Sequence, residues 1–115
     1  MTVTAHASGT QTTTVPTEHF LTSPNVAGTF TLHLDTVNMA AGDIIEVRIY
    51  QMVLTAGTQR VAYYQRYFDQ QPTDDLIKIS VPISNELTDT NALRFSLNQV
   101  KGTSRNFPWK VLKYA

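Results

Sequence analysis

Apolar and polar residues alternate at every second position along much of this chain, and the alternation limits its fold more than any other feature. In residues 28–37, Phe30, Leu32 and Leu34 fall on one face of an extended strand, and threonine, histidine and aspartate occupy the other. Successive side chains of a strand point to opposite faces, so this pattern predicts a half-buried strand. No segment of ordinary helix length repeats apolar residues at helical spacing, and we therefore predict an all-β protein.

Five further runs have strand character and are separated by turn residues such as glycine and proline. The predicted strands cover residues 28–37, 43–55, 59–69, 76–81, 91–100 and 106–114. At least one more strand from the N-terminal third brings the expected total to seven or eight, at roughly ten-residue spacing. This spacing is typical of an antiparallel sandwich of two sheets, either jelly-roll-like or Ig-like.

Two of these runs carry more specific expectations. The run 43–55 is predicted to be the central strand, with an inner face made of Ile45, Val47, Ile49 and Val53. The last run contains Pro108, which has no backbone N–H to donate to a neighbouring strand. We therefore expect that strand at a sheet edge or at a bulge.

The first 25 residues differ from the rest because they are rich in threonine, serine and glycine and poor in apolar residues. Such a segment buries too little area to offset the backbone entropy lost on ordering. We predict an extended N-terminal arm at 1–25 and a β-sandwich domain at 26–115. The alternative is that residues 11–15 supply the first strand of the sandwich.

Size and charge exclude several classes of partner. The 115 residues fit one domain. Nine basic and nine acidic residues give a formal net charge of zero, so no overall field attracts nucleic acid or an anionic membrane. No apolar stretch approaches the ~20 residues of a membrane helix, and the N-terminus lacks the features of a signal peptide. We expect a soluble, unexported protein that binds neither nucleic acid nor membrane.

The residues that usually carry catalysis or bind metals do not form a recognisable constellation. The chain has no cysteine, and His6, His19 and His33 lack the close spacing of a ligand pair. Asp74 and Asp75 are neighbours in a predicted loop, and the other acidic residues are scattered. Each glycine stands alone, and no nucleophile elbow is present. We predict no catalytic site, no metal and no cofactor, and therefore no enzyme.

The strand at 59–69 interleaves arginine with tyrosine, a composition enriched in protein interfaces and in their binding hot spots. The candidate partner-binding residues there are Arg60, Tyr63, Tyr64, Arg66 and Tyr67. The arm adds four candidates, because an extended threonine-rich segment can add a strand to the open edge of a neighbour: Thr12, Thr13, Thr14 and Phe20. A protein interface or a core role is favoured over carbohydrate binding, and carbohydrate binding over single-stranded nucleic acid.

The C-terminal half carries a strand-loop-strand packing pattern. Its residues are Phe95, Leu97, Gln99, Gly102, Thr103, Arg105, Phe107 and Trp109, with the run 77–84 upstream. Residues 28–114 resemble small β-sandwich proteins of tailed bacteriophages that act as cement or decoration subunits of the capsid. Phe95, Leu97, Phe107 and Trp109 are expected to form the packing core of this motif.

The resemblance implies a structural role on the outer surface of a phage head, after synthesis in the host cytoplasm. The partners would be the major capsid protein and further copies of the chain, as a dimer or trimer. The N-terminal arm lies outside the resemblance. The alternative function is a carbohydrate-binding β-sandwich module, for example on a virion surface.

Overall fold

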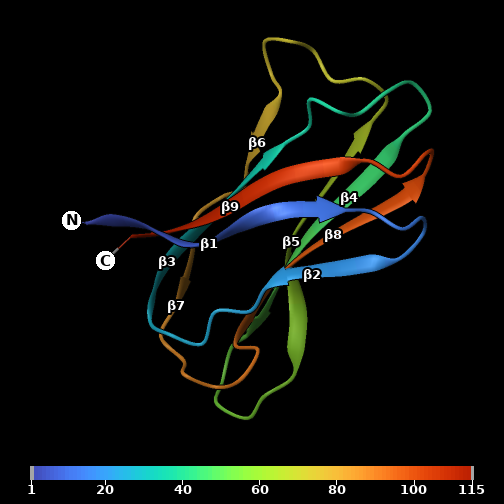
Figure 1. Cartoon of the computed structure of the whole chain (residues 1–115). Helices are drawn as coiled ribbons and strands as arrows, with labels where there is room; N and C mark the ends of the chain where they lie inside the picture. The colour runs from blue at the N-terminus through green and yellow to red at the C-terminus, as the bar shows by residue number, and fades with distance from the viewer. Residues whose placement is uncertain (1, 115) are drawn as a thin grey trace.

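The computed structural model describes residues 2–114, which form two antiparallel sheets with the apolar core between them and no helix (Figure 1). The strands are β1 (Val3–Thr12), β2 (Glu18–Thr22), β3 (Gly28–Asp35), β4 (Ile44–Met52), β5 (Gln59–Phe68), β6 (Ile77–Ile79), β7 (Ile83–Asn85), β8 (Leu93–Lys101) and β9 (Asn106–Tyr114). The predicted all-β architecture with two antiparallel sheets is confirmed. The described residues contain nine strands, however, rather than seven or eight.

The strand pairs are nested along the chain. One sheet has the order β1-β9-β3-β6, with β7 also paired to β3, and the other has the order β2-β8-β4-β5. Among the described strands, only β4 and β5 are both consecutive and paired, and they form the predicted hairpin. Every other pairing joins segments that are distant in sequence, so the sheets form only when the whole chain closes on itself.

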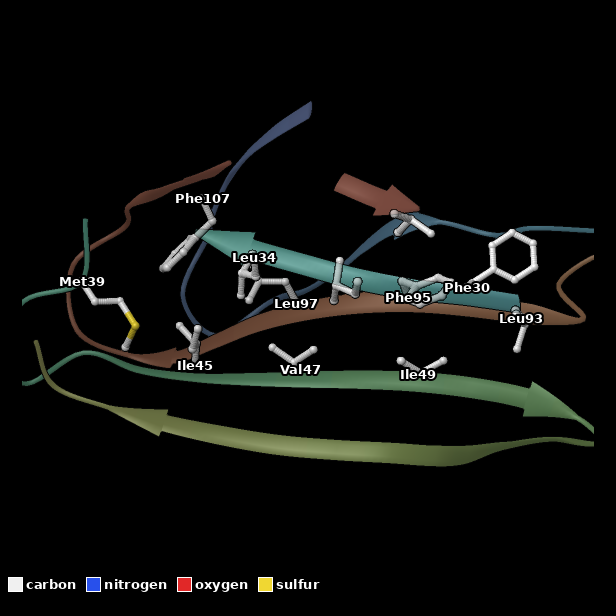
Figure 2. Packing of buried hydrophobic residues seen from close by; sticks show 12 residues of the cluster. Phe30, Leu34, Met39, Ile45, Val47, Ile49, Leu93, Phe95, Leu97 and Phe107 are labelled. Carbon is white, nitrogen blue, oxygen red and sulfur yellow. The ribbon is translucent and has the colours of Figure 1, made fainter. Parts of the chain in front are cut away.

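The core lies between the sheets and consists mainly of the side chains that the alternation placed inward (Figure 2). β3, β4 and β8 each contribute three of them, and β9 contributes two. They are Phe30, Leu32, Leu34, Ile45, Val47, Ile49, Leu93, Phe95, Leu97, Phe107 and Val111, and all are buried. Trp109 is partly buried and packs against this cluster, so the four predicted packing residues of the C-terminal motif lie together in the core.

Two details of the predicted strands are wrong. Val53 was expected on the inner face of the central strand, but β4 ends at Met52 and Val53 is 77% exposed in the turn that follows. Pro108 does not place β9 at an edge, since β9 lies between β1 and β3. The pairing of β9 with β3 begins only at Trp109, so Pro108 precedes the carbonyls of β3 that would need its missing N–H.

The segment predicted as an extended arm supplies one strand to each sheet. β1 pairs along its length with β9, and β2 pairs with β8. Both strands lie at sheet edges, and most side chains of β1 are exposed. An edge strand that is polar on both faces has no alternation, which explains why composition alone indicated an arm.

Asp43 connects the loops at one end of the sandwich. Its side chain is 1% exposed and accepts hydrogen bonds from the Ala40 N–H at 3.0 Å, the Thr103 N–H at 3.2 Å and the Arg105 Nε at 2.9 Å. Burial alone would raise the pKa of Asp43, but these hydrogen bonds and the guanidinium of Arg105 outweigh it and lower the pKa. The carboxylate therefore remains ionised and holds the β3–β4 and β8–β9 loops together.

The β8–β9 loop can approach Asp43 because of Gly102. Its φ of +103° disfavours other residues, and a Cβ there would lie 2.1 Å from Asp43 Oδ1. Thr13 connects the same loop to the β1–β2 connection. Its N–H donates a hydrogen bond to the Arg105 carbonyl at 3.0 Å, and its hydroxyl donates one to Gln99 Oε1. The motif residues Gln99, Gly102 and Arg105 therefore shape this loop.

Replacing Asp43 by asparagine should destabilise the protein severely. Asp43→Asn preserves the shape but leaves Arg105 without its carboxylate, and breaking a buried ion pair costs about 3 kcal/mol or more. We expect the free energy of unfolding in urea to fall by about 3 kcal/mol. Asp74→Asn, in an exposed loop position, is the matched control and should change it by less than about 0.5 kcal/mol. Equal losses in the two variants would contradict the role of Asp43.

Candidate functional site

The outer face of the β2-β8-β4-β5 sheet carries aromatic and charged side chains from all four strands. Residues opposite each other in the register share a face, so the partners of the outward β4 side chains point outward too. We call this surface the Arg–aromatic face. Its members are Glu18 and Phe20 of β2, Glu46, Arg48 and Tyr50 of β4, Tyr64, Arg66 and Phe68 of β5, and Arg94 and Ser96 of β8.

Glu46 organises one half of the Arg–aromatic face. Although it points away from the core, Glu46 is only 8% exposed because its neighbours surround it. The Tyr64 hydroxyl donates to Glu46 Oε2 at 2.7 Å, Arg48 Nη2 lies 3.0 Å from Oε1, and Arg66 Nε lies 3.5 Å from Oε2. The Tyr64 hydrogen bond, with Arg48 and Arg66, lowers the pKa of Glu46 against the opposing effect of burial.

Glu18 organises the other half. Its Oε2 accepts hydrogen bonds from the Tyr50 hydroxyl at 2.6 Å and from the Ser96 hydroxyl at 2.7 Å. The Phe20 and Tyr50 rings lie 5.9 Å apart, and the guanidinium of Arg94 lies 3.4 Å from the centroid of the Phe20 ring. The charged and aromatic groups of four strands are thus held in fixed positions before any partner arrives.

This arrangement suits binding better than catalysis. Both carboxylates are engaged by neighbouring donors, so neither is presented as a general acid or base in a cleft. Three rings remain exposed on the surface although an arginine guanidinium lies over one side of each: Phe20, Tyr64 and Phe68. Three arginines against two glutamates give the face a slight excess of positive charge. Tyrosine, phenylalanine and arginine are the residues enriched in protein interfaces.

The structure divides the partner-binding residues that were predicted on β5. Tyr64 and Arg66 lie on the Arg–aromatic face, but Tyr63 and Tyr67 point inward and pack against the core. Burial, with Tyr63 close by, raises the pKa of Tyr67 to about 12. A register shift near Ala62 puts Arg60 opposite Gln51, on the inward side of the strand. Only two of the five therefore belong to one surface.

The predicted residues of the arm also separate. Phe20 lies on the Arg–aromatic face, whereas Thr12 and Thr14 are exposed near the β1–β2 connection. Thr13 is 2% exposed and its hydroxyl is used within the chain, so its side chain is not available to a partner.

Sequence reasoning missed seven members of this face: Glu18, Glu46, Arg48, Tyr50, Phe68, Arg94 and Ser96. The alternation does place Glu46, Arg48 and Arg94 outward, so the signal existed for each residue alone. Their assembly depends on β8 lying between β2 and β4, which local periodicity does not specify.

The outer face of the other sheet bears a shallow depression of about 360 Å³ lined by Ser8, His33, Asp35 and Lys110 among others. His33 Nε2 lies 3.1 Å from the hydroxyl of Thr31, a side chain that is only 4% exposed. Burial and the charge of Lys110 lower the pKa of His33.

Within residues 2–114, no group of three or more acidic or histidine side chains could hold a metal ion, and no helix could span a membrane.

Comparisons with protein-family profiles, with curated proteins and with solved structures find no significant match.

Neutralising Glu46 should change how stability depends on pH. Because folding lowers its pKa below the ordinary value of 4.5, ionised Glu46 stabilises the fold above that pH, and this contribution is lost as pH falls through the folded-state pKa. Glu46→Gln should lower the free energy of unfolding at neutral pH by about 2 kcal/mol. It should also flatten the loss of stability below about pH 5, measured by urea denaturation at each pH.

The matched control is Glu86→Gln, at an exposed position, which should follow the wild-type pH profile. A Glu46→Gln profile parallel to that of the wild type would show that Glu46 is not held in its ionised form by the fold.

Proposed function

We propose that this protein is a structural, non-enzymatic adhesion subunit: a cement or decoration protein on the outer surface of a bacteriophage head. Its Arg–aromatic face would bind the major capsid protein and strengthen the contacts between neighbouring shell subunits. The observation that carries the proposal is that four strands hold three arginines and four aromatic rings on one sheet face. This concentration of interface residues exceeds what the folding of the sandwich requires.

The strand order supports a finer description of the fold. A jelly roll has nested strand pairs, and its successive strands cross from one sheet to the other. The strand order of this chain has both features, and we assign the sandwich to that class. Jelly rolls occur in viral capsid proteins and in lectins, so the fold agrees with the proposal but does not by itself decide the function.

The energetics suit a subunit that is present in many copies. Arg48 and Arg66 are already paired with Glu46, so binding costs less side-chain entropy than ordering free arginines would. A single contact of modest affinity is sufficient when one subunit touches two shell proteins, because the second contact forms at high effective concentration.

The proposal is tested in purified particles of the virus whose genome encodes this chain. Quantitative mass spectrometry should find the chain in a fixed ratio to a larger shell protein, and particles stripped of it should break at lower temperature. Purified particles that contain the shell protein but lack this chain would contradict the proposal.

A substitution on the Arg–aromatic face should weaken binding without unfolding the chain. Phe68 is 53% exposed, and among the described residues its ring is stacked only by Arg66, so Phe68→Ala should leave stability nearly unchanged. We expect its dissociation constant for stripped shells to rise about tenfold or more, as for a hot-spot aromatic residue. The measurement is cosedimentation of the purified variant with stripped shells.

The matched control is Ile77→Ala, which removes an apolar side chain that is 49% exposed on the outer face of the other sheet. It should bind as the wild type does. Equal binding by both variants would mean that the shell is bound by another surface.

Carbohydrate binding is the second candidate, supported by the exposed rings of Tyr64 and Phe68, on which a sugar could stack. Binding to a glycan array that Phe68→Ala abolishes, without binding to shells, would favour it. The absence of any glycan bound at millimolar concentration would remove this candidate.

A further inference from the structure

The two sheets formed by residues 2–114 have four edges, and three of them are blocked in ways that natural proteins use against unwanted strand pairing. β6 and β7 are three residues each, are separated by Pro82 and carry the buried Lys78. β2 is short, is irregular near Leu21 and carries Glu18. β5 is long but has a register shift near Ala62 and carries two arginines.

The fourth edge, β1, lacks most of this protection. It is ten residues long, contains neither a charged residue nor a proline, and within the described part of the chain it pairs with β9 alone. A register shift occurs only near its start, between Ala5 and Ala7. From Ala7 to Thr12 the pairing is regular, and Ser8, Gly9 and Thr10 are exposed. A long, neutral and regular edge is a template for a further strand.

The ladder fixes which backbone groups of β1 face away from β9. The Thr13 N–H donates to the Arg105 carbonyl at 3.0 Å, one step beyond the regular pairing of Thr12 with Asn106. Hydrogen-bonded pairs alternate in an antiparallel ladder, so Ala7, Gly9 and Gln11 also bond β9. The N–H and C=O groups of Ser8, Thr10 and Thr12 therefore point away from β9, beyond the edge of the sheet. The Thr12 carbonyl already accepts a bond from its neighbour Gln11, which leaves Ser8 and Thr10 with both groups available.

We propose that two copies of this chain dimerise by antiparallel pairing of their β1 strands, with Ser8 of each copy opposite Thr10 of the second copy. The two residue pairs exchange four backbone hydrogen bonds around a two-fold axis at Gly9. Each five-stranded sheet then continues into that of the second copy. The dimer leaves the Arg–aromatic face on the other sheet uncovered, so the inference does not depend on the proposed function.

The chemistry of β1 favours its own copy as the occupant. A neutral strand meets an identical strand without the repulsion that two arginine-bearing β5 edges would produce, and the whole chain has a formal net charge of zero. Gly9, at the axis, lets the two backbones approach, while the indole of Trp109 covers its inner side and keeps it in the strand. The serine and threonine hydroxyls lie opposite each other across the pair and add polar contacts.

The test is the molar mass of the full chain in solution, measured by light scattering over a range of concentrations. The wild type should approach twice its 12.9 kDa. Thr10→Pro removes an N–H that faces away from β9, so we expect the fold to tolerate it, and it should shift the protein to 12.9 kDa at the same concentration. Thr10→Val preserves the N–H and is the matched control, which should remain dimeric.

Thr10→Lys provides a second route that keeps the N–H but places a charge at each copy's edge, and it should raise the dissociation constant of the dimer about tenfold or more. Circular dichroism melting checks that each variant is folded. A wild type that stays monomeric up to millimolar concentration would overturn the proposal. A folded Thr10→Pro or Thr10→Lys variant that stays as dimeric as the wild type would also overturn it.

Discussion

The buried carboxylate of Asp43 is the constraint on which the end of the sandwich depends. It joins the β3–β4 loop to the β8–β9 loop through two hydrogen bonds, from the Thr103 N–H and the Arg105 Nε, and accepts a third from the Ala40 N–H within its own loop. The backbone carbonyl of Asp43 also accepts the N–H of Asp69 at 2.8 Å, from the loop that follows β5. Connections between strands of different sheets must turn sharply, and their backbone groups need partners. One ionised side chain supplies several of these partners, and Gly102 provides the space for it.

The strand β4 links this core to the Arg–aromatic face. Its inward residues, Ile45, Val47 and Ile49, are buried between the sheets, while Glu46 and Arg48 point outward. β8 and β5 flank it on either side, so each outward residue of β4 meets side chains from two neighbours. Any change that shifts the register of β4 by one residue would exchange core and surface together, which couples the stability of the fold to the integrity of the face.

The sequence predicts best those features that depend on near neighbours. The inward triplets of β3, β4 and β8 and the β4–β5 hairpin follow from a period of two and a short glycine-containing turn. The strand β1 was harder to predict because most of its side chains are polar or small on both faces and show no such period, and β2 is only five residues long. The end of β4 at Met52 was not predicted, because Val53 is an apolar residue in the turn and continues the alternation of β4 by chance.

The sequence by itself determined that the chain forms strands, which side of most strands is buried, and that its chemistry is poor in reactive groups, because these depend on residue type and on spacing along a few neighbours. Only the tertiary structure decided the strand order, the assembly of the Arg–aromatic face and the free edge of β1. The physical reason is that these features arise from nested pairs far apart in sequence, such as β1 with β9 and β2 with β8, whose register is set when the whole core closes.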